Sequence, residues 1–315
     1  MLDGLTEGGA PFHRALAEGP EGEARWIWAA DGVRLRAVRW GPGRARGTVL
    51  VFPGRAEYAE KYGRVAAELV AGGHAVLAVD WRGQGLSDRL RPERALGHVE
   101  RFADYQLDVA ALAGHARGLG LPEPWFLLSH SMGGTIGLRA LLEGLPVKAA
   151  AFSSPMWGLR MTAAQRPVAW SVSSVSRALA LGYRLAPRQE ATPSVLACDF
   201  AGNALTSDGE TWDWLRAQVT AVPELALGGP SLHWLNEALR EMRRLMAGPA
   251  PDVPALALVG SEEAVVDPAR IRRRLADWPG ARLVTLPGAR HELLMERPVL
   301  RGRALAEILG HFARA

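Results

Sequence analysis

The sequence predicts an α/β protein with a mostly parallel central sheet, flanking helices and a helical insertion near the middle of the chain. Short apolar runs alternate with longer segments of helical periodicity up to about residue 155, and this alternation resumes at about residue 254. The roughly 95 residues between these two parts have no convincing strand pattern. A chain of 315 residues, 48% of them hydrophobic, can bury the core of one large domain that carries one insertion.

The first half is expected to supply most of the sheet. Asp31-Gly32 is a hairpin turn between two apolar runs, so these runs are expected to pair antiparallel. Gly72-Gly73 is a stop signal for the helix that separates the next two strands. The strands expected before residue 155 are residues 26–30, 33–40, 48–52, 75–79, 125–128 and 147–152, and the helices are residues 59–70, 99–118 and 132–142.

The last part of the chain completes the alternating pattern. The expected elements are a strand at residues 255–259, a helix at 268–276, a strand at 282–286 and a final helix at 299–313. The predicted domains are a first core part at 1–154, a helical cap at 155–250 and a second core part at 251–315. The first 22 or so residues, with several Gly and Glu, are expected to form a loose arm.

Aromatic residues are concentrated in the predicted cap, which holds five of the eleven tryptophans. These are Trp157, Trp170, Trp212, Trp214 and Trp234. A stripe of apolar residues at helical spacing follows Pro167, a residue typical of a first helical turn. The stripe consists of Val168, Val172, Val175, Leu179 and Tyr183.

Composition and motifs exclude several classes of function. The 37 basic and 33 acidic residues leave a net charge of +4, which is too small and too evenly spread to favour nucleic acid. The two lysines follow Glu60 and Val147, so no Walker-type phosphate loop is present, and Gly83-Gln-Gly85 lacks the third glycine of a dinucleotide motif. His291-Glu292 lacks a second histidine at zinc spacing, so no metal site is predicted.

The cellular context is also constrained by the sequence. A single cysteine cannot form an intramolecular disulfide, the amino terminus lacks the features of a secretory signal, and no apolar stretch suggests a transmembrane helix. We therefore expect a cytoplasmic protein that can make peripheral contact with a membrane. The sequence does not indicate the oligomeric state.

The most informative segment is an apolar strand that runs into a sharp turn of small residues, Ser129-His130-Ser131-Met132-Gly133-Gly134. A strand, a tight turn and a helix in this order form a nucleophile elbow, in which the serine hydroxyl projects above the strand ends. Ser131 is therefore the candidate nucleophile. The alternative is a strand-to-helix loop, rich in Gly and Ser, that has no chemical role.

A serine nucleophile needs a base within hydrogen-bonding distance, and the base needs an acid to orient it. Of the eight histidines, His291 alone lies in a short loop after a predicted late strand. The loop after the preceding strand contains Glu263 and Asp267. Asp267 precedes Pro268, as a helix N-cap would, so Glu263 is the preferred acid and Asp267 the alternative. A capping or surface role for His291 is the competing interpretation.

An oxyanion site requires backbone N–H groups that point toward the developing negative charge. One should come from Met132, which follows the nucleophile at a helix N-terminus. The second should come from the loop after the third strand, where the N–H of Arg55 is the best candidate. The Arg55 side chain has no predicted catalytic role.

These motifs resemble the α/β-hydrolase superfamily and, within it, the bacterial lysophospholipases of the monoacylglycerol lipase-like (serine aminopeptidase-type) group. The similar segments include Pro53-Gly-Arg-Ala-Glu57, residues 79–87, 129–134, 205–208, 223–230 and 260–267, and Gly288-Ala-Arg-His291-Glu292. The resemblance implies an α/β-hydrolase fold with a helical cap and matches Ser131, Glu263 and His291 to the triad. It also matches Arg55 and Met132 to the oxyanion donors.

Three positions depart from the family pattern. Pro53 replaces a histidine before the oxyanion glycine, Ser129 replaces the first glycine of the elbow, and Glu263 replaces an aspartate. The first two supply no reacting group and should be tolerated. Glu263 is one carbon longer than Asp, so its loop must lie further from His291.

The implied function is hydrolysis of a lipid ester through an acyl-enzyme, without a cofactor, and lysophospholipids are the first candidate substrates. Monoacylglycerols or small esters come second, and the further alternatives are a proline-type aminopeptidase and a non-catalytic binding module. Acidic cap residues such as Glu190, Asp199 and Asp208 would favour the peptidase. The candidate substrate-binding residues are Gly54, His130, Trp157, Trp170, Tyr183 and Trp234, and arginines that could meet a phosphate are Arg160, Arg166 and Arg177.

Overall fold

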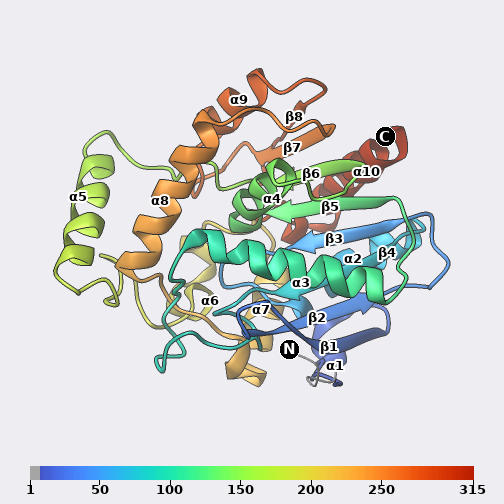
Figure 1. Cartoon of the computed structure of the whole chain (residues 1–315), viewed down its shortest axis with the longest axis horizontal. Coiled ribbons are helices and arrows are strands. Elements are labelled where there is room, and N and C mark those ends of the chain that lie inside the picture. Colours follow the sequence, from blue (N-terminus) through green and yellow to red (C-terminus); the bar gives the residue numbers. More distant parts are fainter. Residues whose placement is uncertain (1–7) are drawn as a thin grey trace.

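The computed structural model describes residues 8–315 and contains one sheet of eight strands (Figure 1). The strands are β1 (Gly22–Trp28), β2 (Arg34–Trp40), β3 (Thr48–Phe52), β4 (Ala75–Asp80), β5 (Trp125–His130), β6 (Ala149–Ser153), β7 (Ala255–Gly260) and β8 (Arg282–Leu286). Their order is β1-β2-β4-β3-β5-β6-β7-β8. β2 pairs antiparallel with β1 and β4, and all other pairs are parallel. The mostly parallel sheet predicted from the sequence is confirmed.

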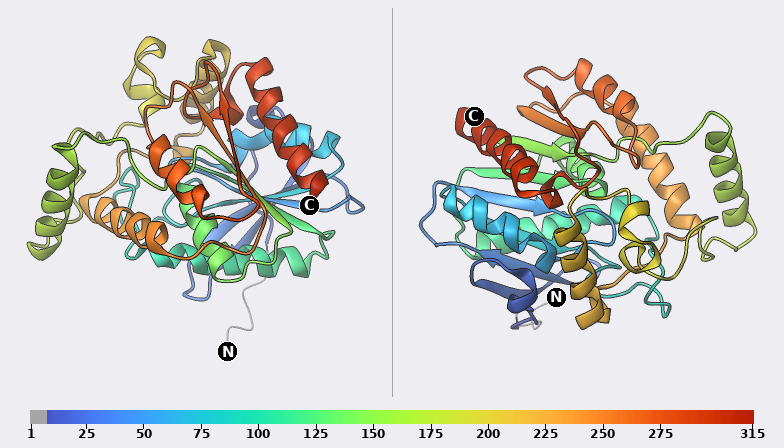
Figure 2. Two further views of the ribbon diagram at one scale, coloured as in Figure 1. Left: turned by 90° about the horizontal axis from the view of Figure 1, so that it is seen from above. Right: turned by 180° about the vertical axis from the view of Figure 1, so that it is seen from behind.

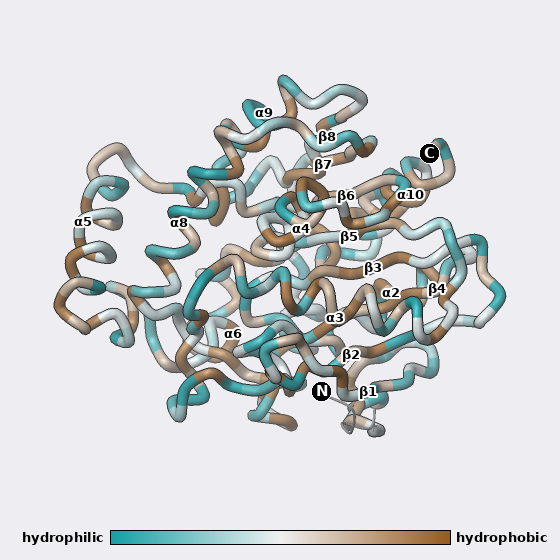
Figure 3. Tube along the Cα trace, in the orientation of Figure 1, coloured by the Kyte–Doolittle hydropathy of each residue, from teal (hydrophilic) through white to brown (hydrophobic). Residues whose placement is uncertain are grey.

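Helices cover both faces of this sheet (Figure 2). Strand side chains alternate between two buried clusters, so that Leu50 and Phe52 join one cluster while Val49 and Val51 join the other. The first cluster also contains residues of α3 (Tyr105–Gly118), α4 (Met132–Leu142) and α9 (Pro268–Ala276). The second contains residues of α2 (Gly63–Ala71) and α10 (Pro298–Arg314). The buried strands, such as β3, are among the most apolar parts of the chain (Figure 3).

The region between β6 and β7 contains four α-helices and no strand of the sheet. It contains α5 (Gln165–Ala178), α6 (Ser194–Ala197), α7 (Gly209–Ala221) and α8 (Leu232–Ala247). Figure 1 shows α5 at the edge of the molecule, with α8 between it and the sheet. α5 packs on α8 through small polar side chains, because Asn236 donates hydrogen bonds to Ser173 and Ser174 at 3.0 and 3.1 Å. Trp170 of α5 also borders a small pocket together with Leu239 and Met242 of α8.

The prediction of a loose arm over the first 22 residues is wrong for the part that the structure describes; residues 1–7 lie outside it. Residues 14–17 form the short helix α1 (Arg14–Ala17), and Ala17 is buried. The carbonyl of Leu16 accepts hydrogen bonds from Trp214 and Gln218 of α7 at 2.9 and 2.7 Å. Because a backbone carbonyl makes these contacts, the amino-acid composition of the segment does not indicate them.

The remaining differences concern the ends of elements. β1 begins at Gly22 rather than residue 26, and residues 59–62 and 102–104 form 3₁₀ turns before α2 and α3. Such differences of a few residues are usual where a helix starts with a tight turn. Within the described part of the chain, no helix is both long and apolar enough to cross a membrane.

Candidate active site

Ser131 lies at the turn between β5 and α4 with a backbone conformation that is rare for a residue with a side chain. Its φ is 49° and its ψ is −115°. The surrounding backbone holds this conformation, since Ser131 N–H donates to Ser153 O at 3.0 Å and Met156 N–H donates to Ser131 O at 2.9 Å. Strained backbone that is fixed by its neighbours is typical of functional sites.

Glycines at the start of α4 allow the turn to approach the sheet closely. A Cβ atom at Gly133 would lie 2.0 Å from Phe52 O, and one at Gly134 would lie 2.6 Å from the Cβ of Pro155. Ser129, at the position of the first elbow glycine, is fully buried, and its hydroxyl donates to Ala151 O at 3.4 Å. The extra hydroxymethyl group is therefore accommodated with a hydrogen-bond partner.

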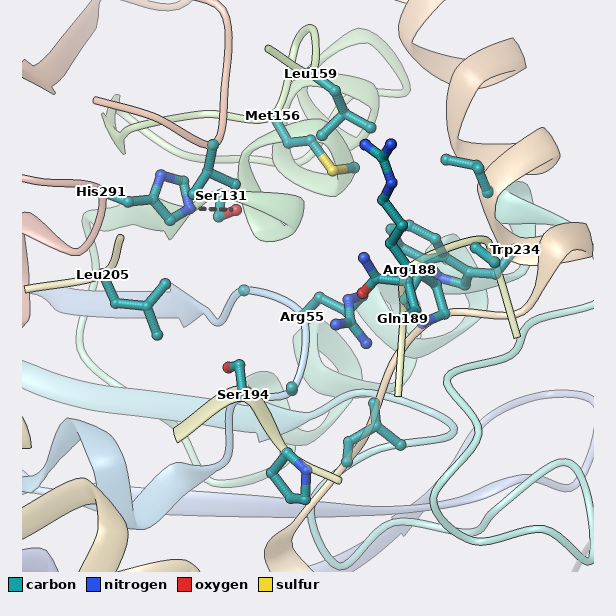
Figure 4. A pocket seen from close by; sticks show the side chains of 18 of the residues that line it. Arg55, Ser131, Met156, Leu159, Arg188, Gln189, Ser194, Leu205, Trp234 and His291 are labelled. Carbon is teal, nitrogen blue, oxygen red and sulfur yellow. Dashed lines mark hydrogen bonds between the residues drawn. The ribbon is translucent and has the colours of Figure 1, made fainter. Parts of the chain in front are cut away.

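Ser131, His291 and Glu263 form a chain of hydrogen bonds above the carboxyl ends of the parallel strands. The Ser131 Oγ to His291 Nε2 distance is 3.0 Å (Figure 4), and the His291 Nδ1 to Glu263 Oε2 distance is 2.8 Å. A carboxylate can only accept, so Nδ1 carries the ring proton and Nε2 is left to accept the serine proton. The three residues follow β5, β8 and β7 respectively. This geometry suits proton transfer from Ser131.

The Glu263 carboxylate is buried and held by its own loop. Glu263 Oε1 accepts hydrogen bonds from the N–H groups of Val265 and Val266 at 2.6 and 3.0 Å. Burial alone would raise the pKa of Glu263, but His291 and these N–H groups outweigh it and lower the pKa below its usual value. The alternative acid, Asp267, instead accepts from Ala269 N–H at 3.0 Å as the N-cap of α9. The structure therefore brings Glu263, and not Asp267, to His291.

Two backbone N–H groups are available near Ser131. Those of Met132 and Arg55 have no acceptor among the described residues. The N–H of Gly54, in contrast, donates to the carboxylate of Glu57. Met132 and Arg55 thus remain the candidate oxyanion donors, and Gly54 is fixed by Glu57.

A buried charge network lies behind this loop and was not predicted from the sequence. Lys61 Nζ lies 2.7 Å from a carboxylate oxygen of both Glu57 and Glu292. Tyr62 donates to Glu57 at 2.6 Å, and His130 lies 3.7 Å from Glu57. The sequence contains one signal for it: Lys61, one of only two lysines in the chain, follows Glu57 by four residues, a spacing at which two side chains can pair.

The network also bears on metal binding. Atoms of Glu57, His130 and Glu292 lie within 4.8 Å of one another, the only such group among the described residues. The Lys61 ammonium already provides positive charge to both carboxylates. Burial raises the pKa of Glu57, and Lys61 with its neighbours outweighs this and lowers the pKa to about 2. Lys61 thus pairs with both carboxylates, and Glu292 Oε2 is left without a hydrogen-bond partner among the described residues.

A cavity of about 810 Å³ opens beside Ser131 and His291. Its lining is largely apolar and comes from both the sheet ends and the helical region (Figure 4). Of the predicted substrate-binding residues, Gly54, His130 and Trp234 line it. Apolar lining residues that were not predicted include Met156, Leu159, Leu205, Leu215, Val219 and Leu227.

The other three predicted substrate-binding residues do not line the cavity. Trp157 is buried and donates to Gly134 O at 3.1 Å, which supports the elbow from behind. Trp170 borders a separate small pocket, and Tyr183 is half exposed under the guanidinium of Arg91. The aromatic content of the insertion could not distinguish core positions from cavity positions.

The predicted apolar stripe is only partly a cavity wall, and α5 ends at Ala178, before Leu179 and Tyr183. Val168 and Val172 line the cavity, whereas Val175, Leu179 and Tyr183 do not and are 55%, 62% and 48% exposed. The stripe therefore faces the cavity at its first residues, Val168 and Val172, and faces solvent at its last residues.

Two segments of the insertion are attached to the loops of the site. His291 N–H and Glu292 N–H donate to the carbonyls of Ala204 and Leu205 at 3.4 and 2.8 Å. Gly228 N–H donates to Ala95 O at 2.8 Å. The segments at 205–208 and 223–230, which resemble the lysophospholipase group, thus contact the histidine loop and the loop of Ala95, and Gly228 O also accepts from the Arg55 side chain.

The arginines proposed for a phosphate differ in position. Arg160 lines the cavity and donates to the carbonyl of Glu263. Arg166 lies 3.7 Å from Asp267, and Arg177 forms a 2.6 Å ion pair with Glu237 outside the cavity. Arg55 and Arg188 line the cavity as well.

Comparisons with known proteins agree with this architecture. A lysophospholipase L2 from Escherichia coli is 33% identical over 299 residues, covering 90% of this chain and 85% of that protein. A probable lysophospholipase L2 from Haemophilus influenzae is 28% identical and covers 85% of this chain and 83% of its own. The solved monoglyceride lipase of Saccharomyces cerevisiae superposes with a TM-score of 0.72 at 19% identity, covering 91% of this chain and 94% of its own.

The structural likeness confirms the α/β-hydrolase fold predicted from the sequence. The profile of one family, described as "Serine aminopeptidase, S33", matches residues 43–298. The match spans most of the chain, from before β3 to the start of α10. The protein therefore belongs to this family of hydrolases.

Proposed function

We propose that this protein is a lysophospholipase that releases a fatty acid from a lysophospholipid through an acyl-enzyme. The observation that carries the proposal is the hydrogen-bonded chain of Ser131, His291 and Glu263 at the wall of a large apolar cavity. The similarity to lysophospholipase L2 over 90% of the chain supports the same substrate class.

The first half of the reaction forms the acyl-enzyme. His291 Nε2 takes the proton of Ser131 as Oγ attacks the ester carbonyl carbon, and the carbonyl oxygen becomes an oxyanion. The N–H groups of Met132 and Arg55 stabilise that oxyanion, while Glu263 stabilises the imidazolium. The tetrahedral intermediate collapses, the ester bond breaks, and the leaving alcohol oxygen takes the proton from His291.

The second half returns the enzyme to its starting state. Water gives a proton to His291 Nε2 and attacks the acyl carbon, which again forms an oxyanion at the same two N–H groups. The bond to Ser131 Oγ then breaks, Oγ regains the proton from His291, and the fatty acid leaves. Neither step oxidises or reduces the substrate, so the residues named here are sufficient for both steps.

The cavity favours an acyl chain as the bound group. Its lining contains apolar residues from the sheet ends, α5, α7 and α8. Apolar surface that is removed from water contributes about 25 cal/mol per Å² to binding, so a long acyl chain would gain several kcal/mol there. A volume of about 810 Å³ is within the range of sites for molecules of this size.

The same lining disfavours an aminopeptidase. A peptide amino group needs an unpaired carboxylate, and Glu190, Asp199 and Asp208 do not line the cavity. The two carboxylates that do, Glu57 and Glu292, are both paired with Lys61 among the described residues.

We also propose peripheral contact with a membrane through the exposed end of the α5 stripe. Val175 and Leu179 are exposed, and the same helix lines the cavity with Val168 and Val172, so a lipid could pass from one surface to the other. Replacing Val175 and Leu179 by Ser should weaken sedimentation with phospholipid vesicles. Val299→Ser, at an 82% exposed position on α10, is the control, and equal binding by all variants would contradict the contact.

The function is tested with a panel of lysophospholipids, monoacylglycerols, short esters and aminoacyl amides, run beside Ser131→Ala. Fatty acid released preferentially from lysophospholipids, and only by the wild-type protein, is the expected result. Release of fatty acid from neutral esters alone would support the proposed mechanism but would mean that the substrate is a monoacylglycerol and not a lysophospholipid. Cleavage of amides alone would replace the ester-hydrolase proposal by the peptidase.

A further inference from the structure

The guanidinium of Arg55 lies in the cavity without an acidic partner. Its Nη1 donates to Gly228 O at 2.7 Å, and its Cζ lies 5.8 Å from the ring centroid of Trp234. No carboxylate of the described residues lies within ion-pair distance, and Nε and Nη2 have no acceptor among them. Figure 4 shows this side chain between Ser131 and Trp234.

Arg55 is half-buried, and two of the three fully buried arginines, Arg36 and Arg82, are neutralised by carboxylates, whereas Arg274 only donates to the carbonyl of Pro249. Arg36 contacts Glu60 and Asp80 at 2.6 and 2.8 Å, and Arg82 contacts Asp31 and Asp108 at 2.7 and 2.8 Å. Burial lowers the pKa of Arg36, Arg55 and Arg82, but the carboxylates around Arg36 and Arg82 outweigh burial and raise theirs. Arg55 lacks such carboxylates, so burial lowers its pKa to about 10 and it stays cationic at neutral pH. A desolvated, unneutralised cation favours an anionic ligand.

The rest of the lining reinforces this positive charge. Arg188 also lines the cavity (Figure 4) and has no ion pair among the described residues. The carboxylates of the lining are already engaged by Lys61. Arg55, Arg160 and Arg188 thus line a mainly apolar cavity without an ion pair among the described residues, a combination that matches an amphiphile with an anionic group.

We propose that the Arg55 guanidinium binds the phosphate diester of the lysophospholipid headgroup while the N–H of the same residue stabilises the oxyanion. This inference rests on the proposed lysophospholipase function. In a glycerol lysophospholipid, roughly six covalent bonds separate the ester carbonyl carbon from phosphorus, and roughly six separate the arginine N from Cζ. One residue can therefore reach both groups, and its guanidinium offers paired N–H donors to two phosphate oxygens.

The test compares the hydrolysis of a lysophosphatidylcholine and a monoacylglycerol that carry the same acyl chain. The variants are Arg55→Met, which removes the charge, and Arg55→Lys, which keeps it. The control is Arg272→Met, at an exposed position on α9, which changes the net charge equally. The quantity compared is kcat/KM for the lysophosphatidylcholine divided by kcat/KM for the monoacylglycerol. We expect Arg55→Met to lower this ratio by about ten- to a hundredfold. Arg55→Lys should recover part of that ratio, and Arg272→Met should match the wild-type protein.

The two proposals fail in different ways. Hydrolysis by the wild-type protein with an unchanged ratio in Arg55→Met would overturn the role of Arg55 and leave the lysophospholipase proposal intact. An absence of any hydrolysis would contradict the lysophospholipase proposal.

A binding measurement decides the role of Arg55 even without turnover. Calorimetry on Ser131→Ala, with and without Arg55→Met, compares an ether-linked lysophospholipid with an alkylglycerol, both with chains short enough to remain monomeric. A loss of at least tenfold in the affinity ratio supports the headgroup site, and an equal ratio overturns it. Inorganic phosphate is the third ligand, and phosphate binding as tight as that of the ether lipid would mean a general anion site instead.

Discussion

Replacing Lys61 by Met should destabilise the protein and disturb the oxyanion loop, because Lys61 is the cation between Glu57 and Glu292. Both carboxylates are buried, and removing one partner of a buried ion pair costs about 3–5 kcal/mol. The lowering of the Glu57 pKa from 4.5 to about 2 corresponds to about 3 kcal/mol, which is the same magnitude. In a chain of 315 residues, a loss of 3 kcal/mol lowers Tm by about 5 °C.

The sign of the pH dependence follows from the same ion pairs. A carboxyl group with a lowered pKa stabilises the folded state above its unfolded pKa, and that contribution is lost as the pH falls from about 4.5 toward 2. In Lys61→Met the buried Glu57 carboxylate lacks this cation and should take up a proton at a higher pH than in the wild-type protein. The stability difference between the two proteins is therefore expected to be largest near pH 7 and to narrow as the pH falls.

The assay is urea or thermal unfolding at pH 7 and pH 4, together with kcat on the best ester substrate. Lys148→Met is the matched control, since Lys148 is the other lysine of the chain and is exposed. A decrease in kcat is also expected, because Glu57 fixes the N–H of Gly54 next to the oxyanion donor Arg55. An unfolding midpoint at pH 7 equal to that of the control, or a stability difference that is the same at both pH values, would refute this reasoning.

Two further predictions concern the elbow and the acid. Glu263→Asp should lower kcat because the shortened carboxylate no longer reaches His291 from a loop positioned for glutamate. Glu263→Ala should lower kcat further, by about a thousandfold or more. Equal rates for Glu263→Ala and the wild-type protein would reject Glu263 as the acid. Gly133→Ala should destabilise the fold by more than about 3 kcal/mol because its Cβ would lie 2.0 Å from Phe52 O, while Gly114→Ala, with open space around its Cβ, should be neutral or stabilising. Similar unfolding midpoints for the two alanine variants would contradict the close approach of α4 to β3.

The sheet and the residues around Ser131 could be predicted because their signals are local. Short apolar runs end in small-residue turns, and parallel strands bring their carboxyl ends to one edge, so Ser131, Glu263 and His291 could be placed together from their positions along the chain. The choice between Glu263 and Asp267 also depended on a local feature, the N-cap before Pro268.

The features that could not be predicted depend on packing between distant segments. The tryptophans of the insertion have similar sequence surroundings, yet Trp234 lines the cavity and Trp157 supports the elbow from behind. The side chain of Arg55 is directed into the cavity by Gly228, which lies 173 residues away in the chain. The carbonyl of Leu16, in the segment predicted to be a loose arm, is bound by α7, and no local pattern reveals this contact.

The central claim is that Ser131 carries the acyl group during catalysis. Intact-protein mass spectrometry after rapid quenching with a lysophospholipid tests it most directly, with fatty acid release followed in parallel for Ser131→Ala. We predict an added mass equal to one acyl group, located on the peptide that contains Ser131, and a loss of turnover by several orders of magnitude in the variant. Turnover by Ser131→Ala close to the wild-type rate, or an acyl group on a different residue, would contradict the account.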